Sequence, residues 1–211
     1  MLQRESPSPR SQARPIISKQ SQGGKGPPQQ VRIISGQYRR TPLAVPGDVP
    51  GLRPTPDRVR ETLFNWLNHL WDADYSVRKV LDLYAGSGAL GFEAASRGAE
   101  HVCMVERNPR AFAALRDTAK TLQASQVELI RGDAVEFARS VRQAFDVVFL
   151  DPPYHQGWLE RIEPWLDRLL QPQGWLYVEC ETPLARLGAW HVVRQGHAGQ
   201  VHYHLLQGPS E

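Results

Sequence analysis

The sequence predicts an α/β fold, in which a mostly parallel sheet of seven strands carries helices on both faces. Three observations predict it. From Lys79 onward, short apolar strands alternate with helical stretches, which is typical of consecutive β-α-β units. Several of these strands are continuous apolar runs, as expected of strands covered on both faces. The last two apolar stretches have little helix between them, so we expect one of the two strands to run antiparallel.

Each element has its own local signal. The helix that begins near residue 56 has apolar residues at steps of three and four, and we expect Thr55 or Asp57 to cap it, with Pro56 at or near its first position. Further helices are expected at about 89–96, 109–122, 134–142 and 158–170. Strands are expected within 79–85, 101–106, 127–133, 145–151, 174–181, 190–195 and 200–206.

The amino-terminal part of the chain differs in composition from the rest. Residues 1–30 contain five apolar residues among Ser, Gln, Pro, Gly and Arg, so we expect a disordered basic tail. Residues 31–52 alternate around Ser35-Gly36 and predict a β-hairpin followed by a loop. Residues 53–211 then form the main domain. Residues 1–60 hold 11 Lys/Arg against 3 Asp/Glu, which favours a phosphate-bearing partner for this end.

The composition also excludes several classes of protein. No run of 18 apolar residues is present, and the chain has no charged-then-apolar signal peptide. The two cysteines, Cys103 and Cys180, lie far apart in apolar segments without ligand spacing, so we expect buried reduced thiols in a cytoplasmic protein and no metal site.

A glycine-rich turn follows the first strand of the main domain. In "LDLYAGSGALG", Gly86, Gly88 and Gly91 fit the pattern G-x-G-x-x-G between a strand and a helix, which permits close approach of a ligand to the backbone. A dinucleotide would fit this pattern equally well. Asp82 favours a cationic ligand over a pyrophosphate, and S-adenosylmethionine carries both an ammonium and a sulfonium group.

The ends of the next two strands carry acids that suit the same ligand. Glu106 is a natural acceptor for two ribose hydroxyls, and Asn108 opens the helix that follows. Asp133, at the third strand's tip, would accept from an adenine amino group or simply cap the next helix.

The stretch "FDVVFLDPPYHQGW" ends a buried strand at a rigid corner. Pro152 and Pro153 cannot donate to a sheet ladder, so the strand must stop there. Asp151 and the carbonyl of Pro152 could accept both N–H bonds of an exocyclic amine, which concentrates the nitrogen's lone pair toward an incoming methyl group. Tyr154 offers a flat face for a base pulled out of its stack. The corner therefore predicts amine methylation.

Together, "DLYAGSGALG" and "DPPY" resemble the S-adenosylmethionine-dependent amino methyltransferases, which have a Rossmann-like class I fold. With "RIISGQYRR" (32–40) and "RPTPDRVRETLFNWL" (53–67), the chain resembles the 16S rRNA (guanine-N2)-methyltransferase family, RsmD, over residues 31–206. The resemblance implies methylation of one guanine N2 in 16S rRNA, on a small ribosomal subunit or an assembly intermediate, by an enzyme expected to be a monomer.

The resemblance also implies roles for individual residues. The catalytic corner would comprise Asp151, Pro152 and Tyr154. The cofactor would be held by Asp82, Ala85, Gly86, Gly88, Glu106, Asn108, Asp133, Ala134, Arg53 and Thr55, and the RNA would meet Pro153, Arg32, Arg39 and Arg40. Two alternatives stay open. One is an amino methyltransferase acting on DNA adenine or protein glutamine, and a more distant one is an NAD-dependent oxidoreductase.

Overall fold

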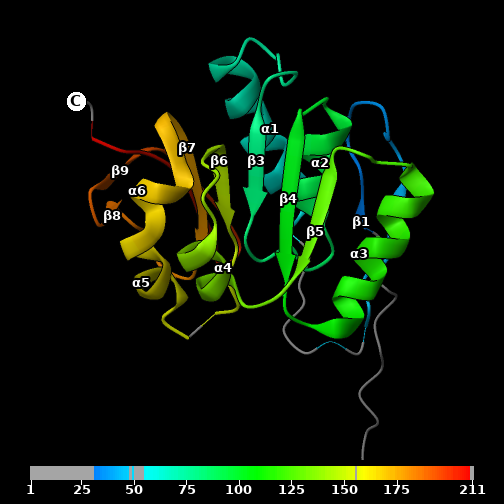
Figure 1. Ribbon diagram of the computed structural model, residues 1–211. Coiled ribbons are helices and arrows are strands. Elements are labelled where there is room, and N and C mark those ends of the chain that lie inside the picture. The colour runs from blue at the N-terminus through cyan, green and yellow to red at the C-terminus, as the bar shows by residue number, and fades with distance from the viewer. Residues whose placement is uncertain (1–30, 48, 50–54, 155, 210–211) are drawn as a thin grey trace, which may run out of the picture.

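The structure is a computed structural model that describes residues 31–47, 49, 55–154 and 156–209. Its main sheet has eight strands in the order β5-β4-β3-β6-β7-β10-β9-β8 (Figure 1). The strands are β3 (Lys79–Asp82), β4 (His101–Glu106), β5 (Val127–Arg131), β6 (Phe145–Leu150), β7 (Leu170–Cys180), β8 (Arg186–Leu187), β9 (Trp190–Ala198) and β10 (Val201–Gln207).

Five neighbouring strands, β3 to β7, are mutually parallel, and β10 runs antiparallel to both β7 and β9. The predicted α/β fold, with a mostly parallel sheet in which one of the last two predicted strands is reversed, is confirmed, and β8 is also antiparallel to its neighbour β9. The two-residue strand β8 lies at the edge of the sheet, beyond the seven strands expected. It is too short to give a period-2 signal in the sequence.

Helices cover both faces of the sheet (Figure 1). One face carries α1 (Asp57–Leu70), α2 (Ala89–Ser96) and α3 (Pro109–Leu122), and the other carries α4 (Ala134–Ser140), α5 (Trp158–Ile162) and α6 (Leu166–Leu169). The helix expected over 158–170 is divided by a 3₁₀ turn, η1 (Glu163–Trp165), because Pro164 lacks the N–H that a continuous helix needs. None of the described helices is long and apolar enough to cross a membrane.

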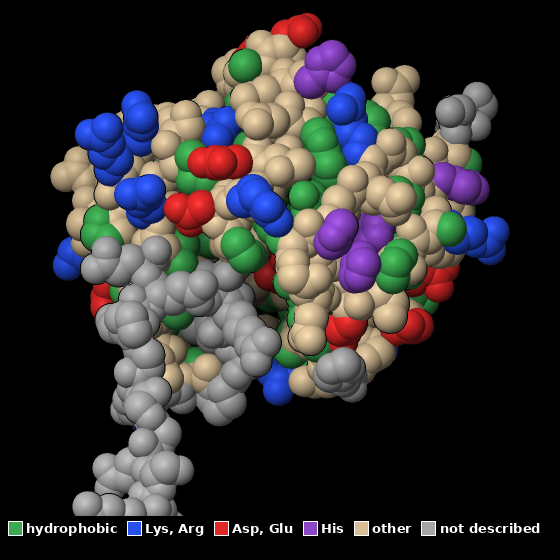
Figure 2. Space-filling view, turned by 180° about the vertical axis from the view of Figure 1, so that it is seen from behind, with side chains coloured by type: hydrophobic (Ala, Val, Ile, Leu, Met, Phe, Trp, Pro, Cys, Tyr) green, Lys and Arg blue, Asp and Glu red, His purple; other side chains and the backbone are tan. Residues whose placement is uncertain are grey.

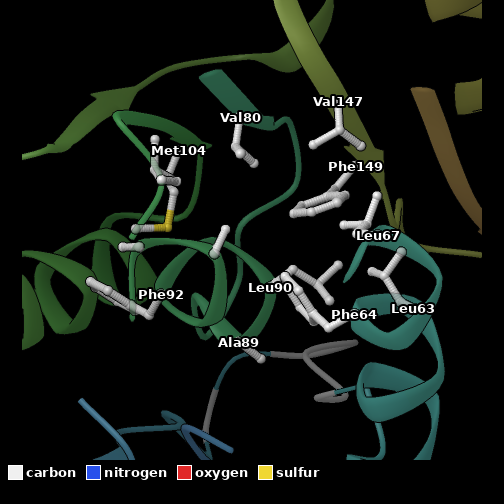
Figure 3. Close-up of a cluster of buried hydrophobic side chains, with 14 of the residues drawn as sticks. Leu63, Phe64, Leu67, Val80, Ala89, Leu90, Phe92, Met104, Val147 and Phe149 are labelled. Atoms are coloured by element: carbon white, nitrogen blue, oxygen red, sulfur yellow. The ribbon is translucent and has the colours of Figure 1, made fainter. Parts of the chain in front are cut away.

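Alternating side chains along the strands supply two apolar layers. On the first face, Leu63, Phe64 and Leu67 of α1 point toward Val147 and Phe149 of β6, with α2 beside them (Figure 3). The intervening strand residues, such as Val148 and Leu150, face the second layer beneath α4, α5 and α6. The parallel strands are thus buried on both sides, which explains their continuous apolar runs.

Residues 31–47, called the N-terminal arm from here on, form the predicted hairpin. Its two short strands, β1 (Val31–Arg32) and β2 (Pro42–Leu43), pair antiparallel. Val31, Ile33 and Leu43 are buried in the same apolar layer as α1 and α2, so the arm shares the core of the main domain. The predicted tail, residues 1–30, lies outside the described residues.

Two features hold the arm on α2. Glu93 accepts hydrogen bonds from the backbone N–H groups of Ile34 and Ser35, at 2.6 and 3.1 Å. Gly36 lies so close to the end of α2 that a Cβ atom there would overlap the carbonyl of Ser96. Its positive φ of 79° is a further reason for glycine at this turn.

The start of α1 differs from the prediction. Pro56 is the N-cap, and the helix has no side-chain cap. Both predicted capping groups have other partners: Asp57 pairs with Arg60 at 2.6 Å, and the Thr55 hydroxyl donates to Asp151. Thr55 therefore ties the start of α1 to the corner after β6, whereas the contact between Asp57 and Arg60 lies within the first turn of α1.

Candidate active site

The acids predicted as site residues lie at the carboxyl ends of four adjacent strands. Asp82 ends β3, Glu106 ends β4, Asp133 follows β5 closely, and Asp151 follows β6 directly. Because β5, β4, β3 and β6 are parallel neighbours, these ends meet at one edge of the sheet. Ligands of open α/β sheets bind at this edge.

The glycine-rich turn crosses this edge between β3 and α2. Gly88 is the N-cap of α2 with a φ of 77°, and a Cβ atom there would meet Phe92 and Leu115, so a larger residue would be strained in conformation and in space. Glu106 anchors the turn, because its Oε2 accepts from the N–H of Gly86 at 2.9 Å. Ala85, also in the turn, is buried.

Glu106, Asn108 and Asp133 all accept backbone hydrogen bonds. The Oε1 of Glu106 accepts from the N–H of Asn108 at 2.6 Å, while Asn108 caps α3 through its side-chain oxygen. Asp133 caps α4 through Oδ1, and Ala134 follows it as a buried residue. The helix-cap interpretation that the sequence left open for Asp133 is therefore observed. Each carboxylate oxygen has a second lone pair, so these bonds leave acceptor capacity for a ligand.

Asp82 lies deeper, with 2% of its surface exposed. Its Oδ2 accepts from the N–H of Gly91 at 3.2 Å, which joins the carboxylate to the first turn of α2. Burial, with a further contribution from the negative charge of Asp151, raises the pKa of Asp82 to about 7. The site thus favours a cation beside this carboxylate.

The corner after β6 presents Asp151 toward the same edge. The Thr55 hydroxyl donates to the Oδ2 of Asp151 at 3.3 Å, and burial raises the pKa of Asp151 to about 7. Pro152 is buried, Pro153 is exposed, and Tyr154 is half-buried. Burial, followed by the charges of nearby acids, raises the pKa of the Tyr154 hydroxyl, which stays neutral at physiological pH.

Glu179 is the acid that sequence analysis missed. It lies on β7 with 2% of its surface exposed, and the hydroxyl of Tyr177 donates to its Oε1 at 2.8 Å. Burial raises the pKa of Glu179 well above its usual value, and the charge of Asp151 adds to this effect. The available signal was an acid in the apolar run "WLYVEC", where an uncompensated charge is costly.

Asp82, Asp151 and Glu179, called the carboxyl cluster from here on, have no ion pair with a basic side chain within the described part of the chain. Two buried acids and the partly exposed Asp151, none paired with a cation in the described residues, suit a positively charged ligand, whose charge would favour their ionised forms. The donor set therefore fits the sulfonium and ammonium groups of S-adenosylmethionine. Pyrophosphate would be repelled, so a nicotinamide dinucleotide fits this edge poorly.

Comparison with known proteins agrees with this geometry. The family model described as "Conserved hypothetical protein 95" matches residues 31–207. Ribosomal RNA small subunit methyltransferase D of Escherichia coli (strain K12) is 41% identical over 205 residues, covering 92% of this chain and 97% of that protein. The chain belongs to the RsmD family.

Solved structures give the same result for the fold. The Escherichia coli protein yhhF superposes with a TM-score of 0.75 at 38% identity, over 86% of this chain and 99% of that one. An RNA methyltransferase from Salinibacter ruber, solved with S-adenosyl-L-homocysteine, has a TM-score of 0.57 at 22% identity, over 75% and 95% of the two chains. The RsmD chain described here thus has the class I methyltransferase fold.

The basic residues expected to meet RNA lie on or near the arm of this RsmD protein. Arg32 is exposed and pairs with Asp57 at 3.7 Å. Arg39 and Arg40, both exposed, border a hollow of about 260 Å³ that also includes Asp57 and Glu61. Figure 2 shows basic and acidic side chains interspersed on this side of the molecule. Arg53 lies outside the described residues.

No site for a metal ion is found among the described residues, since no three His, Cys, Asp or Glu side chains gather suitably. His204, one of the histidines of the final strand, is instead buried, and its Nε2 accepts from the backbone N–H of Leu184 at 3.1 Å.

Proposed function

We propose that this RsmD protein uses S-adenosylmethionine to methylate the exocyclic N2 of a guanine in 16S rRNA. The substrate would be the small ribosomal subunit or an assembly intermediate, and the protein would act as a cytoplasmic monomer. The observation that carries the proposal is the adjacency of two features at one sheet edge. The glycine-rich turn with Asp82 follows β3, and the Asp151 corner follows the neighbouring strand β6.

The cofactor would lie along the carboxyl ends of β3, β4 and β5. Asp82 would face its cationic end, and Glu106 and Asp133 would use their remaining acceptor capacity for the ribose and the adenine. Gly86 and Gly88 would allow the backbone to approach closely. When bound, S-adenosylmethionine supplies the electrophilic methyl group.

The chain's own residues would prepare the guanine nitrogen. The carboxylate of Asp151 and the carbonyl of Pro152 accept its two N–H bonds, which draws the lone pair out of conjugation with the ring. Tyr154 stacks on the extruded base, a contact of about 1–3 kcal/mol for aromatic residues. As the nitrogen gains the methyl group it becomes acidic, and Asp151 or water takes a proton. Two consecutive prolines limit the reorganisation that these steps need.

The proposal is tested by offering isotopically labelled S-adenosylmethionine with three substrates: unmethylated small subunits, bare rRNA and duplex DNA. Products are digested to nucleosides and identified by mass. We expect label in N2-methylguanosine from small subunits and little from DNA. Label in methyladenine or in protein would retain the corner chemistry and reject the guanine assignment.

A second measurement tests the proposed RNA contacts of the arm. Replacing Arg39 and Arg40 with Ala should reduce the salt dependence of subunit binding, by about 0.7 to 0.9 of log–log slope for each lost phosphate contact. An unchanged slope would place the phosphate contacts elsewhere on the protein.

A further inference from the structure

Trp158, the first residue of α5, holds two arginines at the rim of the candidate active site. The guanidinium carbon of Arg161 lies 4.1 Å from the centroid of the indole ring, and that of Arg107 lies 5.6 Å from it. Trp158 itself is 6% exposed, while both arginines are exposed. The buried ring therefore orients two cations at the surface. Because their side chains are already ordered by stacking, binding a ligand would cost them little further side-chain entropy.

Neither arginine is neutralised. Within the described part of the chain, neither Arg107 nor Arg161 forms an ion pair or a side-chain hydrogen bond. Their guanidinium donors are therefore available to a ligand. Arg32 of the arm differs in this respect, because it already pairs with Asp57.

A second tryptophan supplies an internal comparison. Trp165 also lies beneath two arginines, Arg139 at 5.9 Å and Arg168 at 5.6 Å. One nitrogen of Arg168, however, donates to three backbone carbonyls at the end of α4, at distances from 2.6 to 3.1 Å. This arginine caps a helix, so its stacking has a structural explanation. Among the residues that the structure describes, the arginines on Trp158 have no comparable acceptor.

Trp158, Arg107 and Arg161 are called the Trp158 group, and their position connects them with the reaction. Arg107 directly follows Glu106, the acid that anchors the glycine-rich turn. The Trp158 ring also packs edge-on against Tyr84, at the start of that turn, with 5.9 Å between centroids. Along the chain, Trp158 comes four residues after Tyr154. The group thus lies between the cofactor end and the corner.

The Trp158 group and the arm lie on opposite sides of the sheet. The arm packs into the apolar layer of α1 and α2, whereas the neighbours of Trp158 on α5 belong to the layer of α4 and α6. The arm and the Trp158 group therefore carry exposed arginines on the two sides of the sheet.

We propose that Arg107 and Arg161, oriented by Trp158, form a second phosphate-binding site for the RNA strand that carries the target nucleotide. The proposal rests on the proposed function, since it assigns this site to the same substrate. The arm would hold the backbone on one side of the extruded nucleotide, and the Trp158 group would hold it on the other side.

The chemistry favours the phosphates of RNA as the ligand. A guanidinium matches two phosphate oxygens with parallel N–H donors, and a stacked guanidinium is already oriented for this contact. Extruding a base costs a few kcal/mol in unstacking, and backbone contacts on both sides of the nucleotide can offset that cost. A single contact region would leave one flank free to restack.

The test compares four proteins: wild type, Arg107→Ala/Arg161→Ala, Arg107→Lys/Arg161→Lys and Arg139→Ala. Arg139 is a matched control, because it is exposed, lies above a tryptophan ring, and lacks an ion pair within the described residues. Each protein is assayed for binding of unmethylated small subunits across about 50 to 200 mM salt, for KM and kcat, and for affinity toward S-adenosylhomocysteine.

For the double Ala variant we expect a higher KM for subunits and a salt slope that is smaller by about 1.4 to 1.8, the sum of two phosphate contacts. Its affinity for S-adenosylhomocysteine should be unchanged. The Lys variant should keep most of the slope, because it keeps the charge, and Arg139→Ala should match wild type in every measurement.

Three results would overturn the proposal. An unchanged slope and KM in the double Ala variant, with an active wild type, would reject this site alone. A loss of S-adenosylhomocysteine affinity with an unchanged slope would assign the arginines to the cofactor. A wild type that labels no subunit RNA would reject the proposed function, and this site with it.

Discussion

Thr55 contacts two groups of charged residues: the group of Glu93, Arg60 and Arg97, and the carboxyl cluster. The two groups differ in whether their charges have partners within the molecule. Glu93 on α2 is fully buried, yet two backbone N–H groups donate to it and Arg97 pairs with it at 2.8 Å. Arg60, also fully buried, lies 3.9 Å from the same carboxylate. Glu179 is buried to nearly the same extent, but the hydrogen bonds it receives come from hydroxyl groups.

This difference indicates that the group around Glu93 stabilises the fold, whereas the carboxyl cluster serves a ligand or a reaction. The group around Glu93 is compensated within the molecule, and it fastens the arm to α1 and α2. The carboxyl cluster is not compensated, so its acids hold protons at pH values where exposed acids are ionised. Buried charge without a partner lowers stability, and it is retained where a ligand or a reaction uses it.

The largest effect should come from Glu93→Gln. The amide cannot balance Arg97, which loses the carboxylate that it pairs with, while Arg60 keeps its ion pair with Asp57. Leaving the nearly buried Arg97 cation without this partner should cost about 3–5 kcal/mol in the free energy of unfolding. Urea denaturation at pH 8 measures this change. Glu179→Gln is the matched control, because it removes an uncompensated charge and should leave stability unchanged or increase it. Equal destabilisation by the two substitutions would show that the two groups do not differ in how their charges are compensated.

The next largest effect is catalytic. Asp151→Asn keeps the shape of the corner but turns one acceptor oxygen into a donor, which clashes with the N–H bonds of the amine. We expect turnover on small subunits to fall by about 10²- to 10³-fold, as for loss of one electrostatic group in other active sites. Binding of S-adenosylhomocysteine, measured by calorimetry, should persist. Undiminished turnover would remove Asp151 from the mechanism.

Asp82 and Asp151 of the carboxyl cluster could be predicted from the sequence, whereas the contacts of Glu93 could not. The acids at strand ends could be found because a carboxylate next to a glycine turn or a proline corner breaks an apolar pattern. Glu93 lies in "ALGFEAAS", within a short apolar helix, and the backbone N–H groups that donate to it are 58 and 59 residues away, on the arm. Such a contact leaves no periodic signal, because it depends on how the arm folds back over α2.

The same reasoning applies to the helix start and to Glu179. Thr55 and Asp57 have the residue types of N-caps, but neither side chain binds the helix N–H groups. The Thr55 hydroxyl donates to Asp151, and Asp57 pairs with Arg60 within the helix and with Arg32 on the arm. Glu179 could be recognised as an anomaly within a strand. Its proximity to Asp151 depends on β6 and β7 being neighbours in the sheet, which the order of elements along the chain does not specify.

The third prediction concerns pH and stability of the ligand-free protein. Asp82 and Asp151 have pKa values of about 7 in the folded state, against about 4 when unfolded. Between these values the folded state holds protons that the unfolded state has released. The free energy of unfolding should therefore fall as pH rises from about 4 to 7, by at most about 1.4 kcal/mol per pH unit for each proton.

Denaturation of wild type and Glu179→Gln at several pH values measures this effect. The variant should have a shallower decline, since one acid with a raised pKa is gone. His204 has a lowered pKa through burial and acts in the opposite sense, but it contributes equally to both proteins and cancels in the difference. Identical pH profiles would show that Glu179 does not take up the expected proton.

The smallest expected effect concerns Thr55, which contacts both groups. The carbonyl of Thr55 accepts from the Nε of Arg60 at 3.3 Å, while its hydroxyl donates to Asp151. Thr55→Val keeps the contact of the carbonyl and removes that of the hydroxyl with the carboxyl cluster, which is worth about 1 kcal/mol, so turnover should fall about fivefold with little change in the melting temperature. Thr55→Ser restores the hydroxyl and should restore turnover.

The opposite outcome is equally informative. If Thr55→Val lowers the melting temperature as much as Glu93→Gln does, the Thr55 hydroxyl contributes to the stability of the fold, as the group around Glu93 does. If turnover falls with stability intact, the arm and α1 present one hydroxyl to the carboxyl cluster through a backbone that Arg60 holds in place. RNA that binds the arm would then act on the same segment that orients Asp151.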